Sequence, residues 1–343
     1  MLNSLIKMAE NGTLPDALIK IGIKNLCNQR LIWRDSLSFE EIQDHHQTWV
    51  DKLKKSPIAL VPEKANEQHY ELPPSFFEIV LGKNLKYSSG YWNDGVKDID
   101  TSEDDMLDMY LKRGQFEDKM NILELGCGWG SLTLLLAKKY PKAKITAVSN
   151  SNDQRKFIMG RCEKLNVNNI KVITCDMNDF SIDEKFDRVV SIEMFEHMRN
   201  YKKLLSNISN VLNPRGKLFV HIFTHKSLVY PYEDKGAGDW MAREFFSGGL
   251  MPSHNLLLNF QDDLKIEKQW HIPGFHYEKT SYAWLNKMDA NKSKIIDIFN
   301  KTYGDKHSSM WFQRWRIFFL SCAVMFGMKK GKEWGVSHYR FVK

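Results

Sequence analysis

A glycine-rich turn lies near the middle of the chain, in the sequence Asn121-Ile-Leu-Glu-Leu-Gly-Cys-Gly-Trp-Gly130. The apolar first half is typical of a buried strand, and the residues 131–140 that follow favour a helix. Gly126, Gly128 and Gly130 let the backbone approach a ligand closely, because glycine has no Cβ. The free N–H groups at the start of the next helix suit an anionic part of that ligand. We therefore expect a cofactor here, with a purely structural turn as the alternative.

Strand and helix patterns alternate around this turn. Strands are predicted near 121–125, 143–148, 170–174, 186–192 and 216–223, and helices near 131–140, 152–165 and 201–211. This alternation predicts an α/β fold, a doubly wound parallel sheet with helices on both faces. Ligands of such sheets bind beyond the carboxyl ends of the strands.

The two flanks of this region have different patterns. Residues 1–85 are interpreted as a helical N-terminal extension, in which Ser38 and Glu41 are spaced for a capping box and His45 and His46 are expected on the surface. The catalytic domain is predicted to span 86–343, with a lid or cap segment near 225–330. Within that segment we expect a glycine- and aromatic-rich lid near 230–253 and helices near 279–303 and 307–327, and a last strand follows near 334–341.

Charge and cysteine content narrow the class of protein. The net charge of +7 is uneven, because residues 279–343 carry 13 basic and 4 acidic side chains, or +9, which leaves −2 for the rest. This basic end suits weak contact with an anionic membrane surface or, as we favour, a solvated face. No apolar stretch is long enough for a transmembrane helix, and no signal peptide is evident at the first residues. Five cysteines without a C-x-x-C pair argue against disulfides and zinc, so a cytoplasmic protein without a metal or a nucleic-acid partner is expected.

Polar side chains follow two further predicted strands. Ser149 and Asn150 come directly after one strand, with Gln154 one helical turn later, where many nucleotide-binding sheets have an acid for the ribose hydroxyls. Capping of the next helix, at position 151 or 152, is the alternative interpretation of this polar run. Asp176 follows the next strand and can accept a hydrogen bond from an adenine amino group, or act as a turn residue. Met177 beside it can pack on a purine.

The fourth predicted strand ends in Glu193-Met-Phe-Glu-His197. Two carboxylates and an imidazole within five residues are costly to bury unless they are paired or used. At the mouth of a cofactor cleft, Glu193, Glu196 and His197 indicate proton handling and attraction of a cation. An ion pair or a helix cap is the alternative.

Eight segments carry a resemblance over essentially the whole chain: Tyr70-Glu-Leu-Pro, Lys86-Tyr-Ser-Ser-Gly-Tyr, Glu124-Leu-Gly-Cys-Gly-Trp-Gly, Ala147-Val-Ser-Asn-Ser, Glu193-Met-Phe-Glu-His-Met198, Asn259-Phe-Gln-Asp-Asp263, Leu285-Asn-Lys-Met-Asp-Ala-Asn291 and Glu333-Trp-Gly-Val-Ser-His338. Together they resemble the cyclopropane fatty acid synthase superfamily of S-adenosylmethionine (SAM)-dependent methyltransferases. The coclaurine N-methyltransferase-like branch is the most similar. Ser149 stands where related enzymes often have Thr, which keeps the hydroxyl.

The resemblance implies a class I SAM-methyltransferase (Rossmann-like) fold and SAM as the cofactor. It places around the cofactor Tyr87, Ser88, Gly126, Gly128, Ser149, Asn150, Gln154, Asp176 and Met177. It implies N-methylation of a small hydrophobic or aromatic amine, with Glu193 and Glu196 attracting the ammonium and Glu196 or His197 as general base. The residues implied for the amine pocket are Tyr70, Glu71, Phe246, Trp315 and Phe318.

Two alternatives stay open. Lipid cyclopropane synthases of the same superfamily transfer a methylene group to unsaturated acyl chains and hold bicarbonate, and their site resembles this chain at Ser89, Ile192, His221 and Tyr277, together with Glu196. The position of Glu193 is usually small in those enzymes, and a carboxylate there suits a cationic acceptor better than an acyl chain. A SAM-binding scaffold without catalysis is the other alternative. A homodimer also stays open.

Overall fold

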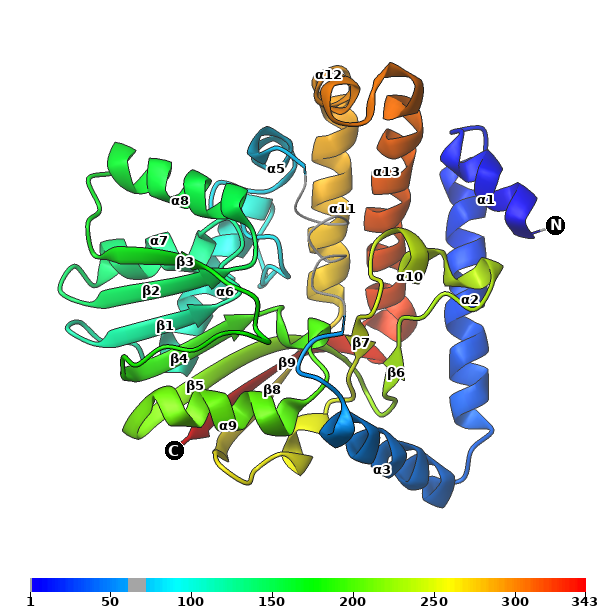
Figure 1. The fold of residues 1–343 in the computed structure, drawn as a ribbon. Helices are drawn as coiled ribbons and strands as arrows, with labels where there is room; N and C mark the ends of the chain where they lie inside the picture. The colour runs from blue at the N-terminus through cyan, green and yellow to red at the C-terminus, as the bar shows by residue number, and fades with distance from the viewer. Residues whose placement is uncertain (1, 61–71) are drawn as a thin grey trace.

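The computed structural model describes residues 2–60 and 72–343, and a seven-stranded sheet forms its centre (Figure 1). The strand order is β3-β2-β1-β4-β5-β9-β8, in which β1 to β5 are parallel and β9 runs antiparallel to both β5 and β8. The strands are β1 (Asn121–Leu125), β2 (Lys144–Ser149), β3 (Ile170–Thr174), β4 (Phe186–Ile192), β5 (Leu212–His225), β8 (Lys265–Pro273) and β9 (Trp334–Val342). The short strands β6 (Tyr230–Pro231) and β7 (Leu250–Met251) pair separately.

Helices cover both faces of the sheet, because successive side chains of a strand point to opposite sides. Ile122 of β1 packs in one apolar cluster with residues of α6, α7, α11 and α13, whereas Leu123 and Leu125 pack in another with residues of α9 and α3. The helices are α1 (Leu2–Glu10), α2 (Asp16–Asp35), α3 (Phe39–Lys55), α5 (Pro74–Val80), α6 (Ile99–Gly114), α7 (Ser131–Lys139), α8 (Asn152–Lys164), α9 (Tyr201–Val211), α10 (Trp240–Glu244), α11 (Phe275–Ala290), α12 (Lys292–Tyr303) and α13 (Asp305–Gly327). Single 3₁₀ turns form η1 (Phe195–His197), η2 (Ala237–Asp239), η3 (Leu256–Asn259) and η4 (Met328–Lys330).

The predicted α/β fold is confirmed, with differences at particular elements. The five predicted parallel strands are present, although β5 is longer than expected, and the last strand predicted near 334–341 is present as β9, between β5 and β8. The single helix predicted near 279–303 is wrong, because Asn291 separates α11 from α12. Strand β8 and helix α6 were not predicted. Strand β8 lies at the edge of the sheet and is largely exposed or half-buried, so its sequence lacks the apolar run of a central strand.

The N-terminal helices pack on the far end of the chain. Helices α1 and α2 contact α13, and α3 contacts α9, so segments far apart in sequence lie side by side (Figure 1). The capping box of Ser38 and Glu41 is confirmed at the start of α3. His45 and His46 are half-buried rather than on the surface: Nε2 of His45 lies 2.8 Å from the carbonyl oxygen of Val229, and Nε2 of His46 lies 3.1 Å from the Ser253 hydroxyl.

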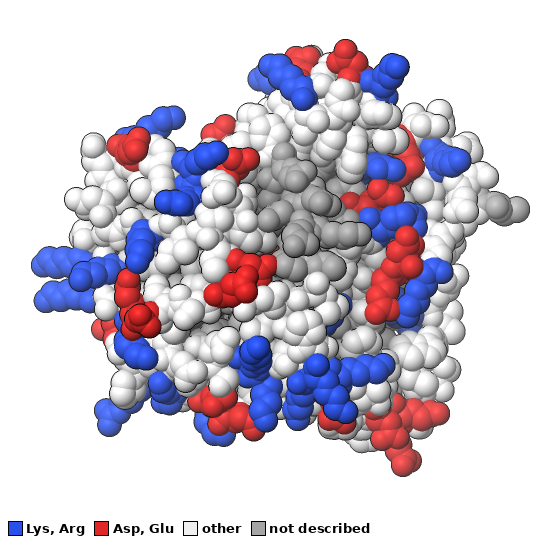
Figure 2. Space-filling model, in the orientation of Figure 1, with Lys and Arg blue, Asp and Glu red and all other residues white. Residues whose placement is uncertain are grey.

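Part of the basic C-terminal region is neutralised by ion pairs with other elements. Arg314 and Arg316 of α13 each bridge two carboxylates, at 2.6 to 2.9 Å. The partners are Glu10 and Glu244 for Arg314 and Asp16 and Asp289 for Arg316. On the face seen in Figure 2, basic and acidic side chains lie side by side around the rim. Across residues 2–60 and 72–343, every helix is too short or too polar to cross a membrane.

Candidate active site at the junction of two cavities

The first cavity opens at the carboxyl ends of β1, β2 and β4, where a doubly wound sheet binds its ligand. All nine residues predicted to contact a cofactor line it, from the Tyr87 loop before the sheet to the residues after β3. They are Tyr87, Ser88, Gly126, Gly128, Ser149, Asn150, Gln154, Asp176 and Met177. Residues separated by ninety positions in sequence therefore surround one space.

The glycines of the β1–α7 turn shape the floor of this cavity. Gly126 has φ +82°, and a Cβ there would come within 2.8 Å of Met194 Cβ. Gly128 has φ +52°, and within the described part of the chain no atom beyond its own neighbours lies within 4 Å of a Cβ built on it. Gly126 is thus required by its conformation and by close packing, whereas Gly128 borders open space. A ligand can approach the backbone at Gly128.

Polar groups around the cavity have unused hydrogen-bonding capacity. The Ser149 hydroxyl donates to Oε1 of Gln154 at 2.7 Å, and the buried Nε2 of Gln154 has no partner among the described residues. The Ser131 hydroxyl at the start of α7 is buried and equally unpaired within that part of the chain. Ser151 caps α8, which is the capping role weighed from the sequence. Asp176 both lines the cavity and accepts a turn hydrogen bond from the Asn178 amide at 2.6 Å.

The second cavity is larger and mostly apolar, with a volume of about 360 Å³. Helices α1, α2, α10 and α13 supply most of its wall, and Phe246 and Phe318 line it as expected for a pocket wall. Trp315 does not belong to the lining described for either cavity: its side chain is fully buried against Phe76 and Phe245. Trp315, which was expected at the pocket wall, thus packs behind Phe318 on the core side of α13. Tyr70 and Glu71 lie outside the described residues.

The two cavities meet at Tyr87, Glu193 and His197, which line both of them. Glu196 lines only the second cavity. Glu193 follows directly on β4 and has φ +47°, a conformation rarely adopted by residues other than glycine. Strained backbone of this kind is retained where the surroundings enforce it and is concentrated at functional sites.

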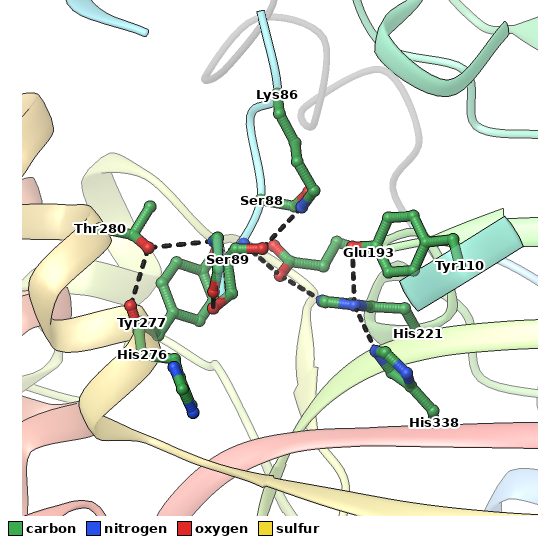
Figure 3. Close-up of polar contacts among 11 residues, drawn as sticks. Lys86, Ser88, Ser89, Tyr110, Glu193, His221, His276, Tyr277, Thr280 and His338 are labelled. Carbon is green, nitrogen blue, oxygen red and sulfur yellow. Dashed lines mark hydrogen bonds and ion pairs between the residues drawn. The ribbon is translucent and has the colours of Figure 1, made fainter. Parts of the chain in front are cut away.

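Three donors hold the Glu193 carboxylate in place (Figure 3). Its Oε1 accepts from the Ser89 amide at 3.2 Å and from Nε2 of His221 at 2.9 Å. Its Oε2 accepts from the Tyr277 hydroxyl at 2.6 Å. Ser89, His221 and Tyr277 are three of the four residues assigned to a bicarbonate-like set, and the fourth, Ile192, lines the cofactor cavity. In this chain, the three donors thus converge on the protein's own carboxylate.

A buried cation lies close to that carboxylate. Lys86 is fully buried, and its ammonium donates to the Ser88 hydroxyl at 2.5 Å and to the Ser89 carbonyl oxygen at 2.6 Å. Burial lowers the pKa of Lys86 to about 8, against the charges of Glu193 and Glu103. Burial raises the pKa of Glu193 to about 6, and the Lys86 charge, the Tyr277 hydroxyl and the Ser89 amide oppose that rise. Near neutral pH, Glu193 is therefore mainly an anion.

Glu196 and His197 have opposite proton affinities. Burial, helped by the charge of Glu193, raises the pKa of Glu196 well above its usual range. Its Oε2 is buried without a hydrogen-bond partner in residues 2–60 and 72–343. Burial lowers the pKa of His197 to about 4, so its imidazole is neutral near pH 7. The His197 ring lies 4.7 Å from the Phe246 ring, centroid to centroid, which links it to the lid.

Several residues of this network were missed from the sequence. Lys86, Tyr110, Thr280 and His338 received no role, although Lys86 and His338 lie within the resemblance segments (Figure 3). Thr280 accepts from the Gly90 amide at 3.0 Å and anchors the loop that carries Ser89. The available signal was the position of Lys86 beside a polar loop, because a buried lysine requires acidic or carbonyl partners.

Comparisons with known proteins agree with this geometry. The pattern of the mycolic acid cyclopropane synthetase family matches residues 61–333. The (S)-coclaurine N-methyltransferase of Papaver somniferum is 36% identical over 342 residues, which cover 99% of this chain and 97% of the relative. A crystal structure of coclaurine N-methyltransferase bound to N-methylheliamine and SAH has a TM-score of 0.96 at 35% identity, with 99% of each chain covered. The cyclopropane-fatty-acyl-phospholipid synthase of Escherichia coli strain K12 is 28% identical over 280 residues, 81% of this chain and 68% of the relative.

The first cavity has the features that SAM requires. It has open space at Gly128, and the amide nitrogen of Gln154 and the Ser131 hydroxyl have no hydrogen-bond partner within residues 2–60 and 72–343. Glu193, which is mainly an anion, borders the same cavity and suits the positive charge of a sulfonium. From the family match and the relatives' similarity over nearly its whole length, this chain belongs to the mycolic acid cyclopropane synthetase family and is a SAM-dependent methyltransferase.

Proposed function

We propose that this enzyme methylates the nitrogen of a small hydrophobic or aromatic amine. The proposal rests on one observation: an anionic Glu193, with Glu196 and His197 beside it, lies where the cofactor cavity meets a mostly apolar cavity. An apolar wall suits the hydrocarbon part of the acceptor, and the carboxylates suit its ammonium group. The similarity to coclaurine N-methyltransferases over 99% of the chain supports the same acceptor class.

The ammonium binds first through charge. Glu193 is mainly ionised near pH 7, so it attracts a cation without losing a proton. Glu196 normally holds a proton, because burial and Glu193 both oppose its charge. A docked ammonium compensates that negative charge and lowers the pKa of Glu196, since an opposite charge nearby favours ionisation. Binding of the cation thus favours release of the Glu196 proton to solvent, which leaves a carboxylate next to the substrate.

Glu196 then acts as the general base. SAM supplies an electrophilic methyl group on a sulfonium, so the protein must align the nitrogen and free its lone pair. Burial still favours proton uptake by Glu196 when the ammonium is docked, whereas burial lowers the pKa of His197 to about 4 and makes its imidazole a weak base. His197 therefore orients the nitrogen at the junction, and Glu196 removes the proton.

Methylene transfer to lipid acyl chains is less well supported. The three donors that correspond to a bicarbonate-binding set in lipid synthases already bind Glu193. An external anion would have to displace that carboxylate. An acyl chain at the junction would leave Glu193 and Glu196 facing hydrocarbon, which is costly for buried carboxylates.

Labelled SAM with a panel of aromatic and aliphatic amines, and in parallel with unsaturated phospholipid vesicles, tests the acceptor class. We expect label in the amines, and label only in the lipid would contradict the proposal.

Glu193→Gln should lower kcat/KM for the amine about 100-fold or more. Circular dichroism and thermal unfolding that match the wild type are the control that the fold is intact. Glu196→Gln should lower kcat more than His197→Asn does, and the reverse order would assign the base to His197.

A further inference from the structure

A buried hydrogen-bond relay runs from Arg113, at the end of α6, to Glu193. Figure 3 shows its inner part, from His338 through His221 to Glu193. A guanidinium nitrogen of Arg113 lies 2.8 Å from Nδ1 of His338. Nε2 of His338 lies 2.9 Å from Nδ1 of His221, and Nε2 of His221 lies 2.9 Å from Oε1 of Glu193. His221 and His338 pair directly in register across β5 and β9, and both are fully buried.

The direction of every bond in this relay follows from its first member. A guanidinium has only donors, so Nδ1 of His338 must be an unprotonated acceptor. Burial lowers the pKa of both His221 and His338 well below the usual range, so each ring is neutral and has one proton. His338 therefore carries its proton on Nε2 and donates to Nδ1 of His221. His221 in turn carries its proton on Nε2 and donates to Glu193.

A second group lies beside the same nitrogen. The Tyr110 hydroxyl is 2.8 Å from Nδ1 of His221 and, because a hydroxyl can donate or accept, it fits either tautomer. If His221 carried its proton on Nδ1 instead, that proton would face the proton on Nε2 of His338. Nε2 of His221 would then be an acceptor and would require a proton on Glu193. The tautomer of His221 thus decides whether Glu193 receives a donor or must supply one.

We propose that Arg113 and His338 are positioning residues that set the tautomer of His221 and thereby keep Glu193 ionised to receive the cationic acceptor. This inference rests on the proposed amine methylation. It assigns Glu193 to charge attraction and leaves the proton transfer to Glu196. Neither Arg113 nor His338 belongs to the lining described for either cavity, so both act through His221.

Other titratable groups face Glu193 from several elements, and their effects on its charge must be distinguished from the effect of the relay. Lys86 favours the anion, Glu196 opposes it, and His197 has its own low pKa. Among residues 2–60 and 72–343, the titratable groups near Glu193 include Lys86 with Glu103 behind it, Tyr110 on α6, Glu196 and His197 on η1, His221 on β5, Tyr277 on α11 and Cys322 on α13. Of these, Glu196 is the group that must be silenced in an experiment between pH 5 and 7.5.

A permanently charged probe isolates Glu193. Benzyltrimethylammonium has no acidic proton, so the pH dependence of its binding reports protein groups only. Calorimetric titrations in a Glu196→Gln background should show affinity rising with pH as Glu193 ionises. Arg113→Met and His338→Phe remove the groups that polarise the Nε2–H donor of His221. Each should move the midpoint of the rise in affinity with pH upward by about one pH unit. Arg113→Lys retains a cationic donor, so the pH midpoint of binding should equal that of the parent protein, which carries Glu196→Gln alone.

Each outcome has one meaning. An unchanged midpoint in a folded Arg113→Met protein that still binds SAM overturns the relay. If the parent instead binds benzyltrimethylammonium no better than its neutral isostere neopentylbenzene at pH 7.5, the cation role of Glu193 fails, and the proposed function fails with it. A test without any relay substitution uses nitrogen-15 histidine NMR of the wild-type protein. We expect the proton of His221 on Nε2, and a proton on Nδ1 would refute the inference even if the variants do not fold.

Discussion

Glu193 at the end of β4 and Tyr277 in α11 share a 2.6 Å hydrogen bond across the junction of the two cavities. With the Ser89 amide and His221, Tyr277 forms a three-donor cradle around the carboxylate. A carboxylate with several donors is favoured as an anion. The cradle is therefore an anion site whose occupant is covalently attached to the protein.

This cradle predicts chemical rescue. Glu193→Gly removes the carboxylate and suits the positive φ of that position, so all three donors become free. We expect amine methylation to fall about 100-fold and to recover partly with added bicarbonate or formate. Glu193→Gln is the matched control, because its amide fills the same space and leaves no room for an anion. Initial rates against anion concentration check this, and equal recovery in both variants would contradict the cradle.

The glycine turn predicts a selective loss of cofactor binding. Gly128→Ala places a methyl group in the open space of the first cavity at φ +52°. We expect SAM affinity to fall about tenfold, with a stability loss of about 1–2 kcal/mol from the left-handed conformation. Gly160→Ala in α8 is the control, since no atom lies within 4 Å of its new Cβ and its φ is ordinary. Calorimetry should find normal SAM binding in that control.

The aromatic cluster of α13 predicts a separation of binding from stability. Phe318 lines the second cavity, the proposed amine site, with its ring stacked on Phe245 at 4.6 Å, whereas Trp315 is buried and absent from the lining described for either cavity. Phe318→Leu should raise KM for the amine about three- to tenfold. Trp315→Phe should leave KM unchanged and lower the free energy of unfolding by about 2 kcal/mol. Steady-state kinetics and denaturant unfolding distinguish them, and a KM effect only in Trp315→Phe would reverse the assignment.

A buried histidine predicts acid sensitivity. Burial lowers the pKa of His225 to about 3, while its Nδ1 accepts from the amides of Ser227 and Leu228. Between an unfolded pKa of about 6.5 and pH 3, the unfolded chain binds a proton that the folded state does not, so His225 lowers stability as pH falls. His225→Asn preserves an acceptor without titrating. Its Tm should decline less than that of the wild type between pH 6.5 and 4, and parallel declines would exclude His225 as the cause.

The parts of the fold that the sequence predicted are those governed by local pattern. Buried parallel strands are continuous apolar runs, and the glycine spacing after β1 marks a ligand turn within a few residues. All nine residues predicted to contact the cofactor lie at strand ends, after them or in the loop before the sheet, so the topology gathers them around one cavity. Strand β8 and the break between helices at Asn291 were not predicted, because an exposed edge strand and a helix interruption have weak local sequence signals.

By itself, the sequence determined the α/β sheet, the cofactor edge and the cluster of Glu193, Glu196 and His197, since each depends on neighbours within a few residues. Only the tertiary structure decided what surrounds the carboxylate. Ser89, His221, Tyr277 and the relay behind them come from a loop, strands β5 and β9 and helices α6 and α11, which meet only when the chain folds. Burial and donor geometry, which set the pKa of Glu193, are properties of that assembled environment and have no signature in local sequence.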